Sequence, residues 1–151
     1  IWEHWDGIKE DGSFWSEAMN SFNHYAYGSI GDWLYRVAAG IDTDESKPGY
    51  KHIIIKPGIK TGFEYVKSSL DTYYGLIALE WSKKEDNIEI YIRIPHNTTA
   101  EILLSGVDAS NLYEGDKHVT SEKIEGILGY EKVGEDTKLK LGSGEYRFIT
   151  G

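Results

Sequence analysis

A seven-residue run near the middle of the chain shows the strictest period-two pattern in the sequence. Four isoleucines alternate with charged or aromatic residues over 88–94, and Pro95 follows them. Successive side chains of a strand point to opposite faces, so this run predicts a half-buried strand that ends at Pro95. Shorter runs of the same kind, separated by Gly, Asn and Asp, lie at 50–56, 63–70, 77–81, 100–104, 139–141 and 146–148. Seven or eight short strands at this spacing predict an antiparallel β-sandwich over residues 49–151.

The first 41 residues follow a different pattern. Four of the five Trp lie there, and apolar residues recur every three or four positions, at Met19, Phe22, Ala26, Ile30, Trp33 and Val37. This spacing is typical of one face of an α-helix and predicts a helix over 20–39, with Gly40 at its C-terminal end. Residues 42–48 are polar and predict a linker. We therefore expect three parts: a loop and helix at 1–41, the linker, and the sandwich at 49–151.

The composition excludes several classes of partner. There are 16 Lys and Arg against 25 Asp and Glu, a formal net charge of -9, and no basic run, so we expect no nucleic-acid partner. Apolar runs are only a few residues long, so we expect no membrane span. The five His lack the spacing of a metal site, and there is no Cys. The chain starts with Ile and without the features of a signal peptide. We therefore expect a segment of a longer protein and leave its compartment open.

The most unusual stretch combines aromatic and acidic residues: IWEHWD at 1–6. Indole faces beside carboxylates suit a sugar, because a pyranose offers an apolar face for stacking and hydroxyls for hydrogen bonds. The alternative is that Trp2 and Trp5 belong to the core and that Glu3 is a surface acid.

His24 marks a second candidate site. In the predicted helix it shares a face with Tyr27, Gly28 and Gly31, and the two glycines would let a ligand or another backbone approach beside the imidazole. The alternative is a structural histidine that is hydrogen-bonded inside a helix interface.

Several motifs, in order, resemble one known family. They are IWEHWD at 1–6, DGSFW at 11–15, MNSFNHYAYG at 19–28, DWLYR at 32–36 and GYKHIIIKP at 49–57. Together they resemble the C-terminal end of a bacterial α-L-rhamnosidase of glycoside hydrolase family 78. The resemblance covers residues 1–81, and beyond them only the strand pattern matches.

This resemblance implies a fold and an activity. The family has an (α/α)6 barrel that holds the active site and a C-terminal β-sandwich beside it, so residues 1–41 would be the last loop and helix of the barrel. The family releases terminal α-L-rhamnose with inversion. By correspondence, Glu3 would be the general base, His24 would contact the sugar, and Trp2 and Trp5 would orient the base or wall the pocket. The general acid would lie earlier in the barrel, outside these residues, and no cofactor would be required.

Three functions from different classes follow. In the first, the chain is the C-terminal fragment of an inverting rhamnosidase, inactive by itself, whose partners are a rhamnose-containing glycoside and the remainder of the barrel. In the second, it is a stand-alone carbohydrate-binding or accessory β-sandwich domain without catalysis; in the third, it is a structural interaction domain. Because the helical stripe would lack its barrel neighbours, we expect the fragment to form a homo-oligomer or residues 1–41 to be poorly ordered.

Overall fold

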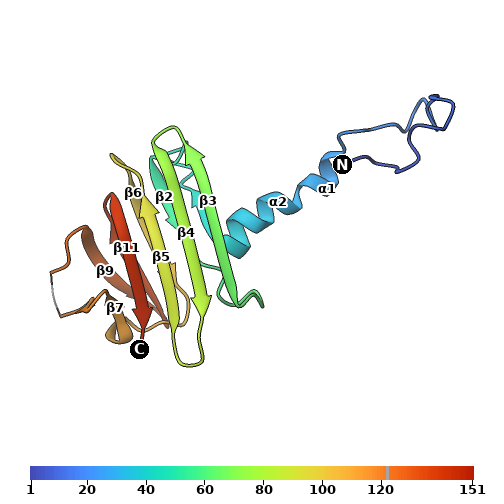
Figure 1. Ribbon diagram of the computed structural model, residues 1–151. Helices are drawn as coiled ribbons and strands as arrows, with labels where there is room; N and C mark the ends of the chain where they lie inside the picture. The colour runs from blue at the N-terminus through green and yellow to red at the C-terminus, as the bar shows by residue number, and fades with distance from the viewer. Residues whose placement is uncertain (122) are drawn as a thin grey trace. The chain divides into compact units, whose positions relative to one another are not determined.

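The computed structural model describes residues 1–121 and 123–151. The chain divides into two compact units, Ile1–Trp33 and Leu34–Gly151, which we call the N-terminal unit and the sandwich unit (Figure 1). Within the described residues, no helix is both long enough and apolar enough to cross a membrane.

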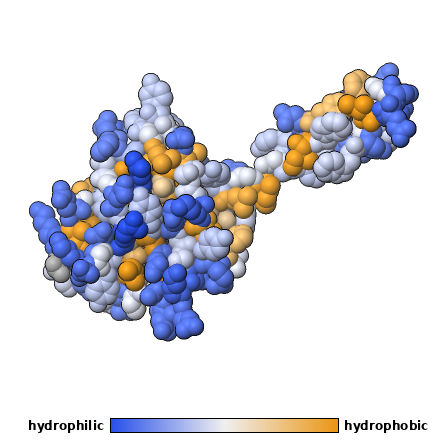
Figure 2. Space-filling view, in the orientation of Figure 1, coloured by the Kyte–Doolittle hydropathy of each residue, from blue (hydrophilic) through white to orange (hydrophobic). Residues whose placement is uncertain are grey.

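The N-terminal unit is a loop that leads into two short helices, α1 (Tyr25–Gly28) and α2 (Ile30–Trp33). The prediction of a helix over 20–24 is wrong, because the backbone of that stretch hydrogen-bonds to the start of the chain instead of to itself. Apolar side chains lie at the surface of this unit (Figure 2). They include three members of the predicted stripe, Met19, Ile30 and Trp33, with exposed fractions of 46%, 58% and 39%.

The sandwich unit begins with a π-helix, η1 (Leu34–Ala39), and continues as two β-sheets (Figure 1). The five-stranded sheet has the order β1 (Ile41–Thr43), β2 (His52–Ile55), β6 (Thr99–Leu104), β10 (Asp136–Leu141), β9 (Ile127–Val133). The six-stranded sheet has the order β3 (Tyr65–Thr72), β4 (Gly75–Lys83), β5 (Ile88–Ile94), β11 (Gly144–Thr150), β7 (Leu112–Glu114), β8 (Lys117–His118). A 3-10 helix, η2 (Ala109–Asn111), precedes β7. The mainly-β sandwich predicted from the alternation is confirmed.

One strand pair differs from the antiparallel pattern. Among the described strands, β2 and β6 are the parallel neighbours, with Ile53 opposite Ala100 and Ile55 opposite Ile102. The chain leaves β2, passes through β3, β4 and β5 in the other sheet, and then returns with β6 beside β2. A hairpin would force an antiparallel pair, whereas this long crossover allows a parallel one.

The core lies between the two sheets and consists mainly of the inward residues of alternating strands. β5 follows the predicted pattern, since Ile90, Ile92 and Ile94 are buried while Glu89 and Arg93 are exposed. The largest fully buried side chains come from both sheets and include Trp81, Phe148, Ile53, Leu79, Ile102 and Leu139. A fully buried Ile or Leu contributes about 1.5–3 kcal/mol relative to an exposed one, so this layer is the main source of the unit's stability.

The end of η1 is fastened to the sheets. Gly40 ends the helix as predicted, with φ +94°, and its N–H donates to the Tyr35 carbonyl oxygen at 2.9 Å. The buried Trp81 indole N–H donates to the Ala38 carbonyl oxygen at 3.3 Å. Strand β1 follows at once and takes up Asp42 and Thr43, the first two residues of the expected linker, because their backbone pairs with that of β2. The sheet therefore starts before residue 49.

Candidate active site

Two backbone hydrogen bonds bring the first residues of the chain beside the entry to α1. The Glu3 N–H donates to the Ser21 carbonyl oxygen at 2.8 Å, and the His24 N–H donates to the Ile1 carbonyl oxygen at 2.8 Å. Polar backbone groups that are shielded from water need hydrogen-bond partners. These two bonds pair two N–H groups with two carbonyl groups, all outside any helix. The Trp-Glu motif therefore runs alongside the Asn-His motif, although the two lie far apart in the sequence.

The side chains of Glu3 and His24 meet at this crossing. The Glu3 Oε2 atom lies 4.0 Å from His24 Nδ1, and the two side chains are 23% and 34% exposed. His24 occupies the N-cap position of α1 in an extended conformation, and its side chain makes no capping hydrogen bond. The imidazole is therefore available to the carboxylate, and both groups can still be reached from outside the unit.

Aromatic packing holds the segment that carries Glu3. Trp2 meets Phe22 edge to face with ring centroids 4.8 Å apart, and Phe14 lies 5.8 Å from the same Phe22 ring. Gly7 is buried against it, because a Cβ there would lie only 3.0 Å from Phe22 Cε1. Such pairs contribute about 0.5–1.5 kcal/mol beyond their buried area. Phe22 thus anchors the segment, and Trp2 keeps 39% of its surface exposed beside the carboxylate.

The other two residues of the motif behave differently. Trp5 is 90% exposed, so the structure does not bring it to Glu3 or His24. His4 lies against Trp15, with ring centroids 4.7 Å apart, and its Nε2 atom is buried without a hydrogen-bond partner in the structure. Neither His4 nor Trp15 was among the predicted site residues, because nothing in their linear spacing links them.

The loop between these aromatic residues is a short hairpin. Ile8 and Phe14 form its antiparallel bridge. Asp11 accepts hydrogen bonds from the Ser13 hydroxyl at 2.6 Å and from the Ser13 N–H at 2.9 Å, and these bonds lower the pKa of the Asp11 carboxyl. The Trp15 N–H then donates to the Gly7 carbonyl oxygen at 3.0 Å and closes the hairpin. The turn at Asp11 and Gly12 thus places Trp15.

The glycines of α1 and α2 keep one side of the helices open. A Cβ added at Gly28 or Gly31 would meet no atom within 4 Å. Tyr27 lies beside His24, with ring centroids 5.7 Å apart. No other segment of residues 1–121 and 123–151 therefore packs against the helices at these two glycines.

The arrangement combines one carboxylate, one imidazole and an exposed indole. A carboxylate at such a site can accept a proton from water, and an imidazole can donate to or accept from a hydroxyl. Among residues 1–121 and 123–151, no group of three or more His, Asp or Glu is placed to hold a metal ion.

Two family models match the chain in succession. Residues 1–38 match the bacterial α-L-rhamnosidase six-hairpin glycosidase domain, and residues 40–119 match the bacterial α-L-rhamnosidase C-terminal domain. The Glu3 and His24 pair and most of η1 lie in the first match, and strands β1 to β8 lie in the second. The loop and helices are therefore the end of a six-hairpin glycosidase domain.

Individual relatives agree with this division. The chain is 34% identical over 148 residues to an α-L-rhamnosidase of Formosa agariphila, covering 98% of this chain and 16% of that protein. It is 36% identical over 102 residues to an α-L-rhamnosidase of Streptomyces avermitilis, covering 68% of this chain and 10% of that protein. The solved structure of the Streptomyces avermitilis α-L-rhamnosidase complexed with L-rhamnose superposes with a TM-score of 0.73 at 28% identity, covering 100% of this chain and 14% of that one.

The chain thus spans between 10% and 16% of the length of these relatives. The C-terminal-domain match alone extends over residues 40–119, more than half of the 151 residues. Together with the preceding match, the sandwich and the ordered motifs, this places the chain in a family: it belongs to the bacterial α-L-rhamnosidases, as a C-terminal portion of one.

Proposed function

We propose that this chain is part of an inverting glycoside hydrolase that releases terminal α-L-rhamnose from glycosides or polysaccharides, with Glu3 as the general base. The observation that carries the proposal is the meeting of Glu3 and His24 at 4.0 Å, within the segment that matches the glycosidase domain. The relative of known structure holds L-rhamnose, which supports this sugar as the substrate unit.

The chemistry assigns a different task to each group. An inverting glycosidase needs a base that deprotonates a water molecule and an acid that protonates the leaving oxygen, with the two carboxyl groups about 6.5–9.5 Å apart. Glu3 takes the proton from water, His24 hydrogen-bonds the sugar, and Trp2 offers a stacking face. Trp5, which is exposed in this unit, walls the pocket only when the substrate or the remainder of the barrel covers it. No cofactor is needed.

The second carboxyl group belongs, in this proposal, to the part of the catalytic barrel that precedes these residues. The residues before Ile41 then form the last loop and helix of that barrel, and the C-terminal sandwich starts with β1 at Ile41. The isolated chain should therefore not hydrolyse an aryl α-L-rhamnoside above background. Stoichiometric activity of the purified 151-residue chain would contradict the assignment of the acid to another segment.

The test of the base is Glu3→Gln in the complete protein that carries this segment. Loss of general-base catalysis should lower kcat on the order of 10²–10⁴-fold. Glu10→Gln is the matched control, since Glu10 is an exposed acid of the same loop. Glu3→Gln should unfold at the same temperature as the parent, so that the loss of kcat cannot be attributed to unfolding. Near-normal turnover of Glu3→Gln would remove Glu3 from the mechanism.

A further inference from the structure

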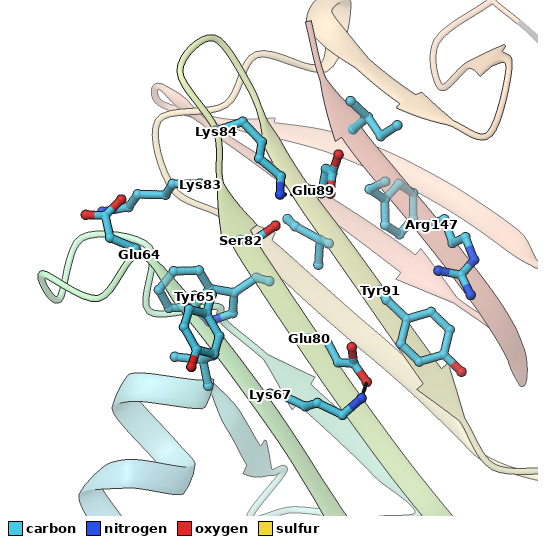
Figure 3. A pocket seen from close by; sticks show the side chains of 15 residues that line it. Glu64, Tyr65, Lys67, Glu80, Ser82, Lys83, Lys84, Glu89, Tyr91 and Arg147 are labelled. Atoms are coloured by element: carbon cyan, nitrogen blue, oxygen red, sulfur yellow. Dashed lines mark ion pairs between the residues drawn. The ribbon is translucent and has the colours of Figure 1, made fainter.

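The outer face of the six-stranded sheet carries a hollow in the sandwich unit. Strands β3, β4, β5 and β11 are neighbours there, and their outward residues line a depression of about 530 Å³ (Figure 3). This volume lies in the range of small-molecule sites, about 300–1,000 Å³. Neither the aromatic segment 1–6 nor the Glu3–His24 pair takes part in it.

One row of side chains crosses all four strands of the hollow. The strand register places Lys67 opposite Glu80, Glu80 opposite Tyr91, and Tyr91 opposite Arg147. Lys67 Nζ lies 2.7 Å from Glu80 Oε1, the pair joined by the dashed line in Figure 3. The Arg147 guanidinium lies over the Tyr91 ring, 4.7 Å from its centroid. A stacked guanidinium keeps its N–H donors directed outward around its edge.

The charges of the hollow nearly balance, because its lining holds Lys67, Lys83, Lys84 and Arg147 against Glu64, Glu80 and Glu89. Besides Lys67 and Glu80, Lys84 Nζ lies 3.8 Å from Glu89 Oε2. In a chain with a formal net charge of -9, this face therefore shows neither the acidic excess nor a basic patch. A polyanion would gain little electrostatic binding free energy on this face. An apolar protein segment would remove water from both ion pairs, which costs free energy. A neutral ligand rich in hydroxyls fits better, because a hydroxyl can donate to a carboxylate and accept from an ammonium group.

Two tyrosines of the hollow lie well apart from each other on the sheet. Tyr65 on β3 is 72% exposed, and Tyr91 lies on β5 with β4 between them. Tyr65 pairs with Ser82, and Ser82 pairs with Glu89. Tyr91 therefore lies two residues beyond the β5 position directly across the sheet from Tyr65. Neighbouring strands are about 4.8 Å apart and residues rise about 3.4 Å, so the two Cα atoms are offset by about 10 Å across the sheet and about 7 Å along it. A ligand that touches both is longer than one sugar ring.

We propose that this hollow binds a neutral oligosaccharide, with one sugar on the Tyr65 ring and another beside the Arg147–Tyr91 stack. Tyr65 supplies an apolar face for the C–H side of a pyranose, and the paired charges supply donors and acceptors for its hydroxyls. Burial, followed by hydrogen bonding to Glu145, raises the pKa of Tyr91, so its phenol stays neutral. The site lies in the sandwich unit and is separate from the proposed catalytic group, which lies in the N-terminal unit.

The test uses the 151-residue chain and a panel of neutral linear tetrasaccharides of gluco, manno and galacto configuration, with free L-rhamnose and a tetragalacturonate as comparison ligands. Titration calorimetry and amide chemical shifts report binding. At least one neutral tetrasaccharide should bind in the millimolar range or tighter and shift amides of β3, β4 and β5. Free L-rhamnose should leave these amides unchanged, and Glu3→Gln should bind the tetrasaccharide as the parent does.

Variants assign the binding to the hollow. Tyr65→Ala should weaken it on the order of five- to tenfold, the range of one aromatic contact. Arg147→Met, which keeps much of the side-chain stem, should weaken it as well. Tyr73→Ala is the matched control, because Tyr73 is 100% exposed in the turn between β3 and β4 and does not line the hollow. The proposal fails if no neutral tetrasaccharide binds, if only the tetragalacturonate binds, or if Tyr73→Ala loses as much affinity as Tyr65→Ala. Near-normal turnover of Glu3→Gln together with intact tetrasaccharide binding would refute the base while leaving this site in place.

Discussion

Gly40→Ala should destabilise the sandwich unit much more than Gly49→Ala. Both glycines have positive φ, +94° and +80°, so an alanine at either site adopts the left-handed conformation. That costs about 1–2 kcal/mol, of which about 0.4–1 kcal/mol is returned by the reduced entropy of the unfolded chain. The two sites differ in the space around them. A Cβ at Gly40 would lie 2.0 Å from the Lys56 carbonyl oxygen, whereas a Cβ at Gly49 would meet nothing within 4 Å.

The clash at Gly40 sets the size of the difference. Only a movement of the backbone can relieve it, and that movement breaks the hydrogen bond from the Lys56 N–H to the buried Gly40 carbonyl oxygen, now 2.8 Å. Leaving a buried group unpaired costs about 1–3 kcal/mol. We therefore expect a loss of about 1 kcal/mol for Gly49→Ala and about 3 kcal/mol for Gly40→Ala.

Urea unfolding of the 151-residue chain, followed by far-ultraviolet circular dichroism, measures both variants. The expected difference of about 2 kcal/mol is roughly 30-fold in the unfolding equilibrium constant. The slope of free energy against urea should stay the same, because neither change alters the surface exposed on unfolding. Equal losses for the two variants would refute the reasoning, since they would show that the contact between Gly40 and Lys56 places no constraint on the fold.

Two further predictions concern charge and association. The backbone N–H of Ser110 first, and then Lys132, lower the pKa of Asp108 from 3.8, so its stabilising effect is present above that pH and is lost as pH falls through the folded-state pKa. Asp108→Asn should therefore unfold at lower urea than the parent at pH 7, by a margin that shrinks below about pH 4; a margin independent of pH would contradict this. The exposed stripe of the N-terminal unit should make the isolated chain dimerise as concentration rises in light scattering. Ile30→Lys should abolish the dimer and Leu128→Lys, on β9, should not, whereas a parent that is monomeric at every concentration would rule the stripe out as an interface.

Local patterns predicted the parts of the fold that depend on neighbours in the sequence. The alternation over 88–94 placed β5 and its inward face correctly, because a strand with one buried side must alternate. Gly40 was correctly placed at the end of the helix, because a positive φ favours glycine at that position. The first turn predicted for the helix was wrong, because the backbone over 20–24 found partners at the start of the chain, which helix periodicity does not register.

The Glu3–His24 site and the hollow also differ in how much of each could be predicted from the sequence. The residues of the proposed sugar site, Glu3 and His24 with aromatic neighbours, could be selected from the sequence, but their 4.0 Å approach depends on backbone bonds between distant segments. Nothing in the sequence indicated the row from Lys67 to Arg147. Each of its members looks like an ordinary outward residue of a strand, and only the order of the strands sets them side by side.

The sequence by itself therefore determined seven of the eleven strands in the described residues, the end of the helix and the family. Each of these is recorded in short stretches of chain, through side-chain periodicity, backbone preference or motif order. The tertiary structure alone decided that β2 and β6 run parallel, that Phe22 anchors the segment of Glu3, and that four strands bring paired charges to one face. Those outcomes depend on which segments bury their apolar faces together, and the free energy of that burial belongs to the assembled core rather than to any local run of residues.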